Sequence, residues 1–358
     1  MKVKHIISTV AFLLIFSVLF TGATYLLRPE DDGAKESVAG FYAEDHNSLD
    51  MVFYGGSACY RYVISPLIWK NYGVTSYVFG TAAQPFETLP TMIAETKKSQ
   101  SPSLYVVEVR NLIMDDVDQK NNKVNALALT HYMRLVTDNL KLSVNRFKLI
   151  AGEVKDKDKT DWYFDIIKNH TNWKTLNLNS LKLMFYNQKS PVEGARTVGV
   201  LQPQTEFDPT ACADKKTPLG SDAQARLVKV LEACKADKAR ILFVSTPYVE
   251  TEQSITEENT MADIIKSSGY NYLNMNYNDK ELGINYKTDF YNNRHVNTLG
   301  AVKVTDALAS YIFKNFPVAH SHTDATKQQW DAAYTTWSGI AGNQENAIKA
   351  AMQKAGIK

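Results

Sequence analysis

The stretch Met51-Val-Phe-Tyr-Gly-Gly-Ser57 decides the fold of this chain, because an apolar run is followed at once by a turn and a serine. An apolar run of this length is typical of a buried strand. Gly55 and Gly56 allow the backbone to turn sharply at the end of that strand. Ser57 is therefore predicted at a strand's carboxyl end, the edge at which open α/β sheets bind their ligands.

The rest of the chain alternates between strand-like and helix-like runs. Strand patterns occupy residues 76–80, 103–110 and 240–245, and a weaker one occupies residues 147–151. Helical patterns occupy residues 86–98, 124–142, 161–170, 223–236 and 299–316. Alternation of this kind predicts an α/β fold with three layers, in which helices cover both faces of a central parallel sheet.

A second polar stretch, Asp289-Phe-Tyr-Asn-Asn-Arg-His-Val-Asn297, lies just before the last of these helical patterns. Asn297 or Thr298 is the candidate N-cap of that helix. His295 therefore lies on a loop and can reach a serine far away in sequence. A serine hydroxyl is a poor nucleophile until a base accepts its proton, and imidazole is suited to that role. We predict that Ser57 and His295 are the nucleophile and base of a hydrolase or acyltransferase.

The order of these motifs resembles the SGNH, or GDSL-like, hydrolase superfamily over most of residues 49–316. The similarity is greatest to the extracytoplasmic branch related to alginate and cellulose O-acetylation factors and to teichoic-acid D-alanylation proteins. It implies a flavodoxin-like α/β/α domain with a central parallel sheet. The motifs that carry it are Val52-Phe-Tyr-Gly-Gly-Ser57, Tyr60-Arg61, Tyr77-Val-Phe-Gly-Thr-Ala-Ala-Gln-Pro85, Pro247-Tyr248 and Asp289-Phe-Tyr before His295.

This resemblance also implies roles for single residues. Ser57 would be the nucleophile, and its N–H together with that of Gly80 would form an oxyanion hole, in which each donor is worth about 3 kcal/mol. The third motif of the family usually brings an asparagine to the end of a strand. Here Val107-Glu-Val-Arg-Asn111 occupies that place, so Asn111 or Arg110 takes the role. Glu108 and Arg110 are two positions apart on the strand, so their side chains face the same side. They are expected to pair with each other or to contact substrate.

The residue that orients the histidine departs from the family pattern. An aspartate usually stands three residues before the histidine, and this chain has Asn292 there. An asparagine can hold an imidazole by a hydrogen bond but cannot stabilise the imidazolium by charge, and loss of the aspartate in one well-studied triad costs about 10⁴ in rate. Either Asp289 supplies the carboxylate for His295, or the site is a weakened dyad, or catalysis is lost. We assign Asp289 to this role.

Residues 6–27 form an unbroken stretch without charge near the amino end. As a helix it would be about 33 Å long, enough to cross a bilayer. Basic residues precede the stretch and acidic residues follow it, which places the amino end in the cytoplasm and the domain outside. These are Lys2, Lys4 and His5 on one side, and Glu30, Asp31 and Asp32 on the other. We predict an uncleaved anchor; a signal peptide cleaved near Thr21-Gly-Ala23 is the alternative.

The chain is thus expected to have four parts. Residues 1–28 comprise a cytoplasmic stub and the anchor, and residues 29–48 form a polar linker. Residues 49–317 form the α/β domain, with a loop-rich insertion near residues 180–220 over the active face. Residues 318–358 form a helical appendage that packs its aromatic side chains onto the domain.

The composition of the chain limits which partners and which cofactors are expected. The formal net charge of +2, without a basic stripe or zinc-finger spacing, argues against nucleic acid. The acidic residues at 115–118 lack the histidine or glycine that a metal site would bring, so neither metal nor another cofactor is expected. Outside the cell a disulfide can persist, and we predict one between Cys212 and Cys234. Cys59 is expected to be a small buried apolar group.

These expectations combine into a membrane-anchored transferase that moves an acyl group, in particular acetyl, onto or off an extracytoplasmic glycopolymer. The residues themselves indicate acyl transfer, whereas the family resemblance supplies the acetyl group and the polymer. The implied partner is a multi-spanning membrane-bound O-acyltransferase, because one span offers no route for activated acyl groups. A carbohydrate esterase of the same fold and a non-catalytic glycan-binding scaffold are the alternatives.

Overall fold

The computed structural model describes residues 2–30, 33–121, 123, 126–155, 159–278, 281–318 and 321–357. Asp31 and Asp32, which entered the charge argument for the anchor, lie outside this set, as does Val124 at the start of one predicted helix. The elements named below all belong to the described residues.

A parallel sheet of five strands forms the centre of the described domain, in the order β2-β1-β3-β4-β5. The α/β architecture predicted from the alternating pattern is therefore confirmed. Chain order reverses at the border between β1 and β3, the place where sheets of this order bind ligands. The strands are β1 (Met51–Tyr54), β2 (Ser76–Val78), β3 (Leu104–Glu108), β4 (Ile241–Ser245) and β5 (Asn271–Asn274).

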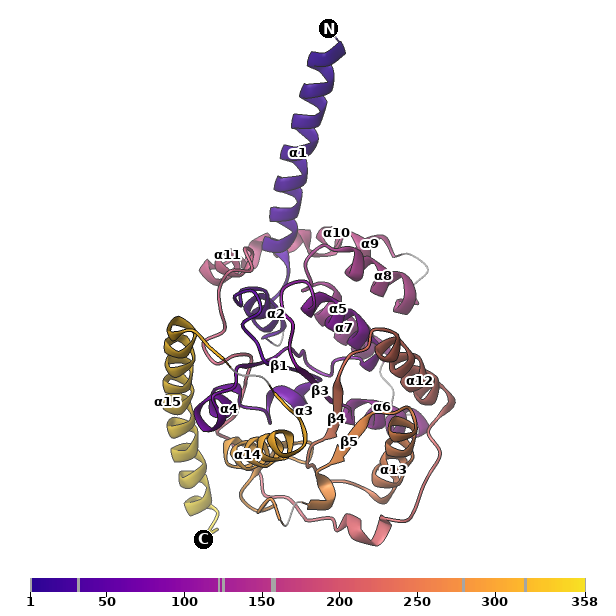
Figure 1. The fold of residues 1–358 in the computed structure, drawn as a ribbon, viewed down its shortest axis with the longest axis vertical. Coiled ribbons are helices and arrows are strands. Elements are labelled where there is room, and N and C mark those ends of the chain that lie inside the picture. The colour runs from indigo at the N-terminus through magenta and orange to yellow at the C-terminus, as the bar shows by residue number, and fades with distance from the viewer. Residues whose placement is uncertain are drawn as a thin grey trace.

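Helices cover both faces of the sheet, and successive side chains of a strand face two different cores. In β1, Val52 and Tyr54 face one core, whereas Met51 and Phe53 face the other. Figure 1 shows α4 and α14 on one side of the domain and α12 and α13 on the other. The first core is covered by α2 (Ala34–Tyr42), α5 (Leu89–Thr96), α12 (Ser221–Ala236) and α13 (Glu252–Ser267), and the second by α3 (Ser57–Tyr60), α4 (Ser65–Tyr72) and α14 (Thr298–Asn315).

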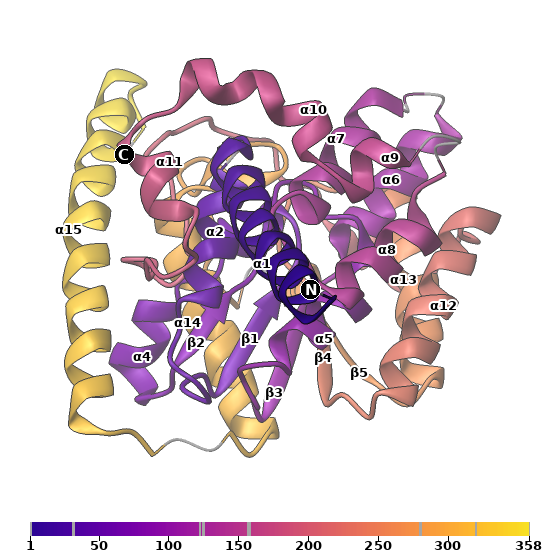
Figure 2. The ribbon, with the colours of Figure 1, turned by 90° about the horizontal axis from the view of Figure 1, so that it is seen from above.

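Other helices surround these layers. The short α9 (Thr160–Tyr163), α10 (Ile166–Asn169) and α11 (Leu178–Leu183) lie near the base of α1 (Lys2–Leu27) in Figures 1 and 2. The carboxyl-terminal α15 (Asp324–Lys354) packs Trp330 and Trp337 into the domain, as predicted for the appendage. The remaining helices are α6 (Arg110–Lys120), α7 (Ala126–Thr137) and α8 (Val144–Glu153).

One predicted strand is wrong, because residues 147–151 lie inside the helix α8. The Ser143 side chain caps this helix by accepting a hydrogen bond from the Arg146 N–H. Its buried residues Arg146, Leu149 and Ile150 follow the three- and four-residue spacing of a helix face. A short apolar run does not distinguish the two structures, since its length fits both.

The apolar amino-terminal stretch forms the single helix α1, which projects from the body of the domain (Figure 1). Residues 3–27 of this helix are long and apolar enough to cross a membrane. The side chains of residues 3–19 are exposed, whereas those of residues 20–28 contact the domain. The length and composition predicted for a membrane anchor are therefore present in one continuous helix.

The predicted linker at residues 29–48 is not a flexible tether, because it contains α2, whose side chains are buried in the domain. Phe41 of α2 stacks on Phe79 with ring centroids 4.0 Å apart. Before α2, Arg28 is buried and its Nε donates to Asp165 Oδ2 at 2.6 Å. A second guanidinium nitrogen of Arg28 donates to the Leu140 carbonyl at 2.7 Å. The apolar helix α1 is thus fixed to the domain rather than joined to it by a flexible segment.

The predicted disulfide between Cys212 and Cys234 is also wrong, because all three cysteines are free and buried. Cys234 faces the core beneath α12, where burial raises the pKa of its thiol to about 12. Cys212 lies in the 3₁₀ turn Pro209–Cys212, whose carbonyl accepts a hydrogen bond from Asn259 of α13. The two thiols serve separate packing sites. Cys59 is buried, as expected.

We predict that Asp165→Ala destabilises the protein strongly. Removing one member of a buried ion pair leaves an uncompensated charge and costs about 3–5 kcal/mol. Arg28 and Arg146 both lie within ion-pair distance of Asp165, with the side chains of all three fully buried. Urea unfolding of the full chain in detergent micelles should show the loss as a lower midpoint. Lys97→Ala removes a half-exposed pair with Asp237 and should change the unfolding free energy by less than about 1 kcal/mol.

Candidate active site

Ser57 follows β1 and begins the short helix α3. The preceding turn needs glycine for two reasons. Gly55 has φ of 151°, a conformation that favours glycine, and a Cβ there would lie 2.9 Å from the Glu108 Cβ. A Cβ on Gly56 would collide with the Asn111 side-chain amide. The ends of β1 and β3 therefore approach closely enough to exclude side chains from this turn, and Ser57 stands at their common edge.

The structure brings Ser57 and His295 together, although they are 238 positions apart in the sequence. The Ser57 Oγ lies 2.7 Å from the His295 Nε2. His295 lies in β7 (His295–Val296), which pairs with β6 (Phe290–Asn292) as a tight hairpin. In this hairpin Asn292 is the register partner of His295. The hairpin thus delivers both the histidine and its neighbour to the carboxyl edge of the sheet.

Asn292 orients the imidazole. Its Oδ1 lies 3.0 Å from the His295 Nδ1 and accepts a hydrogen bond from the Arg294 N–H at 2.8 Å. The backbone N–H needs an acceptor, so the oxygen rather than the amide nitrogen of Asn292 faces this side. The Nδ1 of His295 therefore carries the proton, and the lone pair of Nε2 faces the Ser57 hydroxyl. This tautomer is the one a general base requires.

The assignment of Asp289 as the orienting acid is wrong. Its carboxylate is buried and lies 2.6 Å from the Lys303 Nζ. The same carboxylate accepts hydrogen bonds from the Thr288 hydroxyl and the Asn285 N–H, each at 2.8 Å. Asp289 therefore braces the start of the histidine loop against α14 and does not reach the imidazole. The hairpin register selects Asn292 instead.

His295 lies in cationic surroundings. Burial and the nearby guanidinium groups of Arg110, Arg61 and Arg294 lower its pKa from an ordinary 6.5 to about 3. The imidazole is thus neutral at physiological pH and can accept a hydrogen bond from Ser57. The imidazolium that forms when it takes the serine proton is disfavoured by the same charges. A carboxylate beside the histidine would instead stabilise the imidazolium.

Arg110 holds the histidine loop in place rather than facing a substrate. Its buried guanidinium donates to the Arg294 carbonyl at 2.7 Å and to the Pro247 carbonyl at 3.2 Å. Tyr62, which sequence reasoning missed, lies in the same network and is fully buried. The Tyr62 hydroxyl donates to the Pro247 carbonyl at 2.8 Å and accepts from the Val296 N–H at 3.2 Å. No sequence pattern around Tyr62, which lies two residues after Tyr60, indicates this role.

Glu108 is likewise internal. It is buried, and its Oε1 lies 4.0 Å from the Arg110 Nε. The Thr246 hydroxyl donates to the same oxygen at 3.3 Å. Burial raises the pKa of Glu108, with Arg110 acting in the opposite direction. The expected pairing of Glu108 with Arg110 is therefore present as a long contact beneath the Gly55 turn, and both side chains are buried.

The remaining predicted donors gather at the same turn. Gly80 follows β2, and a Cβ on it would lie 2.5 Å from the Gly55 carbonyl oxygen. Among the described residues, neither the Ser57 N–H nor the Gly80 N–H has a protein acceptor. The first N–H groups of a helix have no partner within it, which explains the Ser57 donor. Asn111 packs its amide against Gly56 and makes one long hydrogen bond, 3.4 Å to the Gln84 carbonyl. These groups can form an oxyanion hole.

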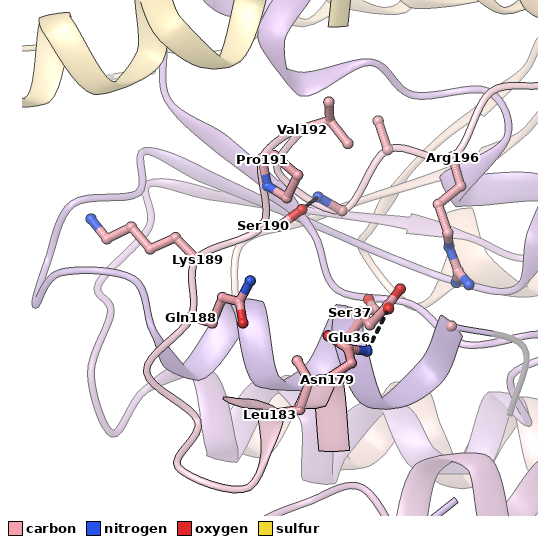
Figure 3. Close-up of a pocket in the computed structure, with 13 residues that line it drawn as sticks. Glu36, Ser37, Asn179, Leu183, Gln188, Lys189, Ser190, Pro191, Val192 and Arg196 are labelled. Atoms are coloured by element: carbon pink, nitrogen blue, oxygen red, sulfur yellow. Dashed lines mark hydrogen bonds between the residues drawn. The ribbon is translucent and has the colours of Figure 1, made fainter. Parts of the chain in front are cut away.

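Aromatic and basic side chains surround the pair. The Tyr291 ring stacks on the His295 ring with centroids 5.3 Å apart. The Arg196 guanidinium lies over the Tyr60 ring, 3.6 Å from its centroid, and donates to the Gly80 carbonyl at 3.4 Å. Arg196 also lines the pocket of about 280 Å³ in Figure 3, between α2, α11 and residues 188–196. This pocket therefore adjoins the side of the site where Gly80 lies.

Comparison with known proteins assigns no family to this chain, and its described side chains form no metal site. No protein-family model matches this chain, and no curated protein is significantly similar to it. Among the residues that the structure describes, no group of three or more His, Cys, Asp or Glu side chains could hold a metal ion.

We predict that Asn292→Asp raises the pKa of His295 by at least 1 unit, because an opposite charge against Nδ1 favours the imidazolium by about 1–3 units. NMR titration of the full chain with labelled histidine measures this, and His295→Gln assigns the signal. Asp289→Asn is the matched control, since it removes a carboxylate from the same loop but not from the imidazole. An equal pKa change in both variants would contradict the contact between Asn292 and His295.

Proposed function

We propose that this protein is a membrane-anchored acyltransferase of the SGNH type, which moves an acetyl group onto or off an extracytoplasmic glycopolymer. The observation that carries the proposal is the 2.7 Å contact between the Ser57 Oγ and the His295 Nε2 at the switch point of a parallel sheet. Nucleophile and base within hydrogen-bond reach, with a third group orienting the base, are the signature of covalent acyl transfer. The family resemblance of the motifs supplies the acetyl group and the polymer.

The chemistry follows from the arrangement. The Ser57 oxygen attacks the carbonyl carbon of an ester while its proton passes to the His295 Nε2. The N–H groups of Ser57 and Gly80, with the Asn111 amide, would stabilise the oxyanion. When the ester C–O bond breaks, the leaving alcohol takes the proton from His295 and an acyl-serine remains. A sugar hydroxyl then gives its proton to His295 and attacks the acyl carbon. As the bond between that carbon and the Ser57 oxygen breaks, His295 returns the proton to Ser57.

The apolar helix α1 and the charges near its two ends support a location at the membrane, outside the cytoplasm, for this activity. Basic residues in the first turn of α1 and acidic residues after its end favour a domain outside the cytoplasm, in a single-pass arrangement. One span offers no route for an activated acyl group, so the proposed partner is a multi-spanning membrane-bound O-acyltransferase that delivers it. With no such partner, water could take the acyl group, and the same site would act as a carbohydrate esterase.

One observation favours a second function. His295 has an amide rather than a carboxylate beside it, and neighbouring arginines lower its pKa. A base of this kind forms imidazolium with difficulty, so a non-catalytic domain that binds glycan or organises the membrane enzyme is the competing proposal. Acyl-serine formation separates the two, because a scaffold would form none.

We predict that Ser57→Ala lowers turnover of a chromogenic acetyl ester by at least about 10³-fold, since the covalent intermediate is lost. The assay uses the full chain in detergent, and mass spectrometry of the wild type should locate acetyl on Ser57. Ser267→Ala, at the end of α13, is the matched control and should retain full turnover. Acetylated product on an added oligosaccharide would indicate transfer rather than hydrolysis. No turnover and no acyl-serine in the wild type would leave the scaffold function in its place.

We further predict an unusually low acid limb in the pH dependence of kcat/KM. This limb reports the pKa of the base in the free enzyme, and His295 stays unprotonated above about pH 3. Activity should therefore persist from pH 7 down to at least about pH 5, where a histidine of pKa 6.5 would be almost entirely protonated. Asn292→Asp should move the limb to higher pH. A wild-type limb between pH 6 and 7 would contradict the cationic environment described for His295.

A further inference from the structure

Large apolar side chains are exposed around the base of α1, on a segment that the proposed chemistry does not use. We call this segment, residues 164–185, the collar. It contains α10, the 3₁₀ helix His170–Thr175 and α11. Trp173 is 64% exposed and Leu178 is 75% exposed. Figures 1 and 2 show α10 and α11 on different sides of α1 where it enters the domain. The other exposed large apolar residues of the collar are Phe164, Ile167, Leu176, Leu181 and Phe185.

The collar is fixed to α1 by specific contacts. The Asn172 side chain donates to the Leu27 carbonyl at 3.0 Å, which satisfies one carbonyl at the end of α1. The rings of Phe20 and Phe164 meet edge to face at 6.3 Å. The buried ion pair from Arg28 reaches Asp165 inside the collar. The height of the collar along α1 is therefore set by the fold.

The part of α1 that projects beyond the collar is shorter than the hydrocarbon core of a bilayer. Residues 3–19 are the exposed part of α1, and 17 residues at a helical rise of about 1.5 Å are about 25 Å long. The hydrocarbon core of a bilayer is about 30 Å thick. A crossing helix must therefore place roughly one more turn in the membrane, and that turn is the part which the collar surrounds. A tilted helix would need still more length.

We propose that the collar is a lipid-binding surface that enters the leaflet from which the domain emerges. The proposal rests on α1 crossing the membrane and is independent of the chemistry at Ser57. The missing depth of about 5 Å matches the shallow insertion of amphipathic interfacial helices. Trp173 is suited to this level, because its ring has an apolar body and a polar N–H.

The charged side chains of the collar also fit a lipid surface. Lys168, Lys174 and Lys182 are exposed within it. Lysines beside an apolar surface extend their ammonium groups to the phosphate level and attract anionic headgroups. The collar is continuous with the exposed surface of α1, so lipid that covers the helix meets the collar next. Immersed in this way, the collar holds the domain at one height and orientation, and with it the Ser57 site.

The tryptophans of the chain make the proposal measurable. All five lie in the described residues, and Trp173 is the exposed one. The other four are at most 8% exposed, and α1 contains none. The full chain is reconstituted into floated vesicles of phosphatidylcholine and phosphatidylglycerol. Quenching by lipids brominated on the acyl chain then reports contact of Trp173 with lipid, and quenching by aqueous iodide reports its contact with water.

We expect brominated lipids to remove at least half of the Trp173 emission and Trp173→Phe to abolish that component. Leu178→Asp with Leu181→Asp should raise the iodide quenching constant at least threefold, because charges lift the collar out of the leaflet. Val200→Asp, at an exposed apolar residue outside the collar, is the matched control and should change neither signal. Both substituted leucines are exposed, so the variant should fold, which circular dichroism checks.

Three results would overturn the proposal. Strong iodide quenching of the wild type without lipid quenching would mean that the collar stands off the membrane. Shielding of Trp173 from both quenchers would mean that protein covers it, through self-association. Failure of the chain to float with the vesicles would remove the membrane crossing on which the collar depends. None of these results bears on ester turnover, so the failure of this inference and of the proposed function can be told apart.

Discussion

The buried guanidinium of Arg110 is the interaction on which the candidate site depends. A buried cation is costly unless hydrogen-bond acceptors surround it. Arg110 obtains them from the Thr246 and Pro247 carbonyls after β4 and from the Arg294 carbonyl beside the histidine. These carbonyls come from segments far apart in sequence. Satisfying one charge thereby joins the ends of β3 and β4 to the β6–β7 hairpin, and this junction places His295 opposite Ser57.

The same cation has an electrostatic consequence for the histidine. Arg110, Arg61 and Arg294 disfavour positive charge on His295, and Asn292 contributes no negative charge to offset them. These guanidinium groups would favour the negative charge that develops when a carbonyl is attacked. The site is therefore better arranged for an oxyanion than for an imidazolium. The proposed chemistry therefore depends more on stabilising the intermediate than on the strength of the base.

The attachment of α1 links the site to its surroundings. Arg28 and Asp165 bury an ion pair directly after the apolar helix, and α2 then packs into the core. The segment that follows the apolar helix α1 is thus part of the domain. A rigid junction transmits the orientation of α1 to the sheet, which a flexible linker would not do.

Several features could be predicted from the sequence because they depend on neighbouring residues. The apolar run of β1, the glycine turn before Ser57 and the Asn297 cap of α14 are local patterns, and each is present. The helix α13 and the strand β5 could not be found in this way. Their polar residues are buried by pairing with each other, as when the Tyr272 hydroxyl donates to Glu258 at 2.6 Å. Such pairing removes the apolar periodicity on which prediction relies.

The sequence by itself determined the α/β fold, the apolar amino-terminal helix and the two side chains able to act as nucleophile and base. Only the tertiary structure decided which group faces His295, because the hairpin register places Asn292 there and turns Asp289 toward Lys303. It also decided that Cys212 and Cys234 stay apart and that residues 33–42 enter the core. Each of these outcomes depends on distances between residues remote in the chain, which local composition and spacing do not encode.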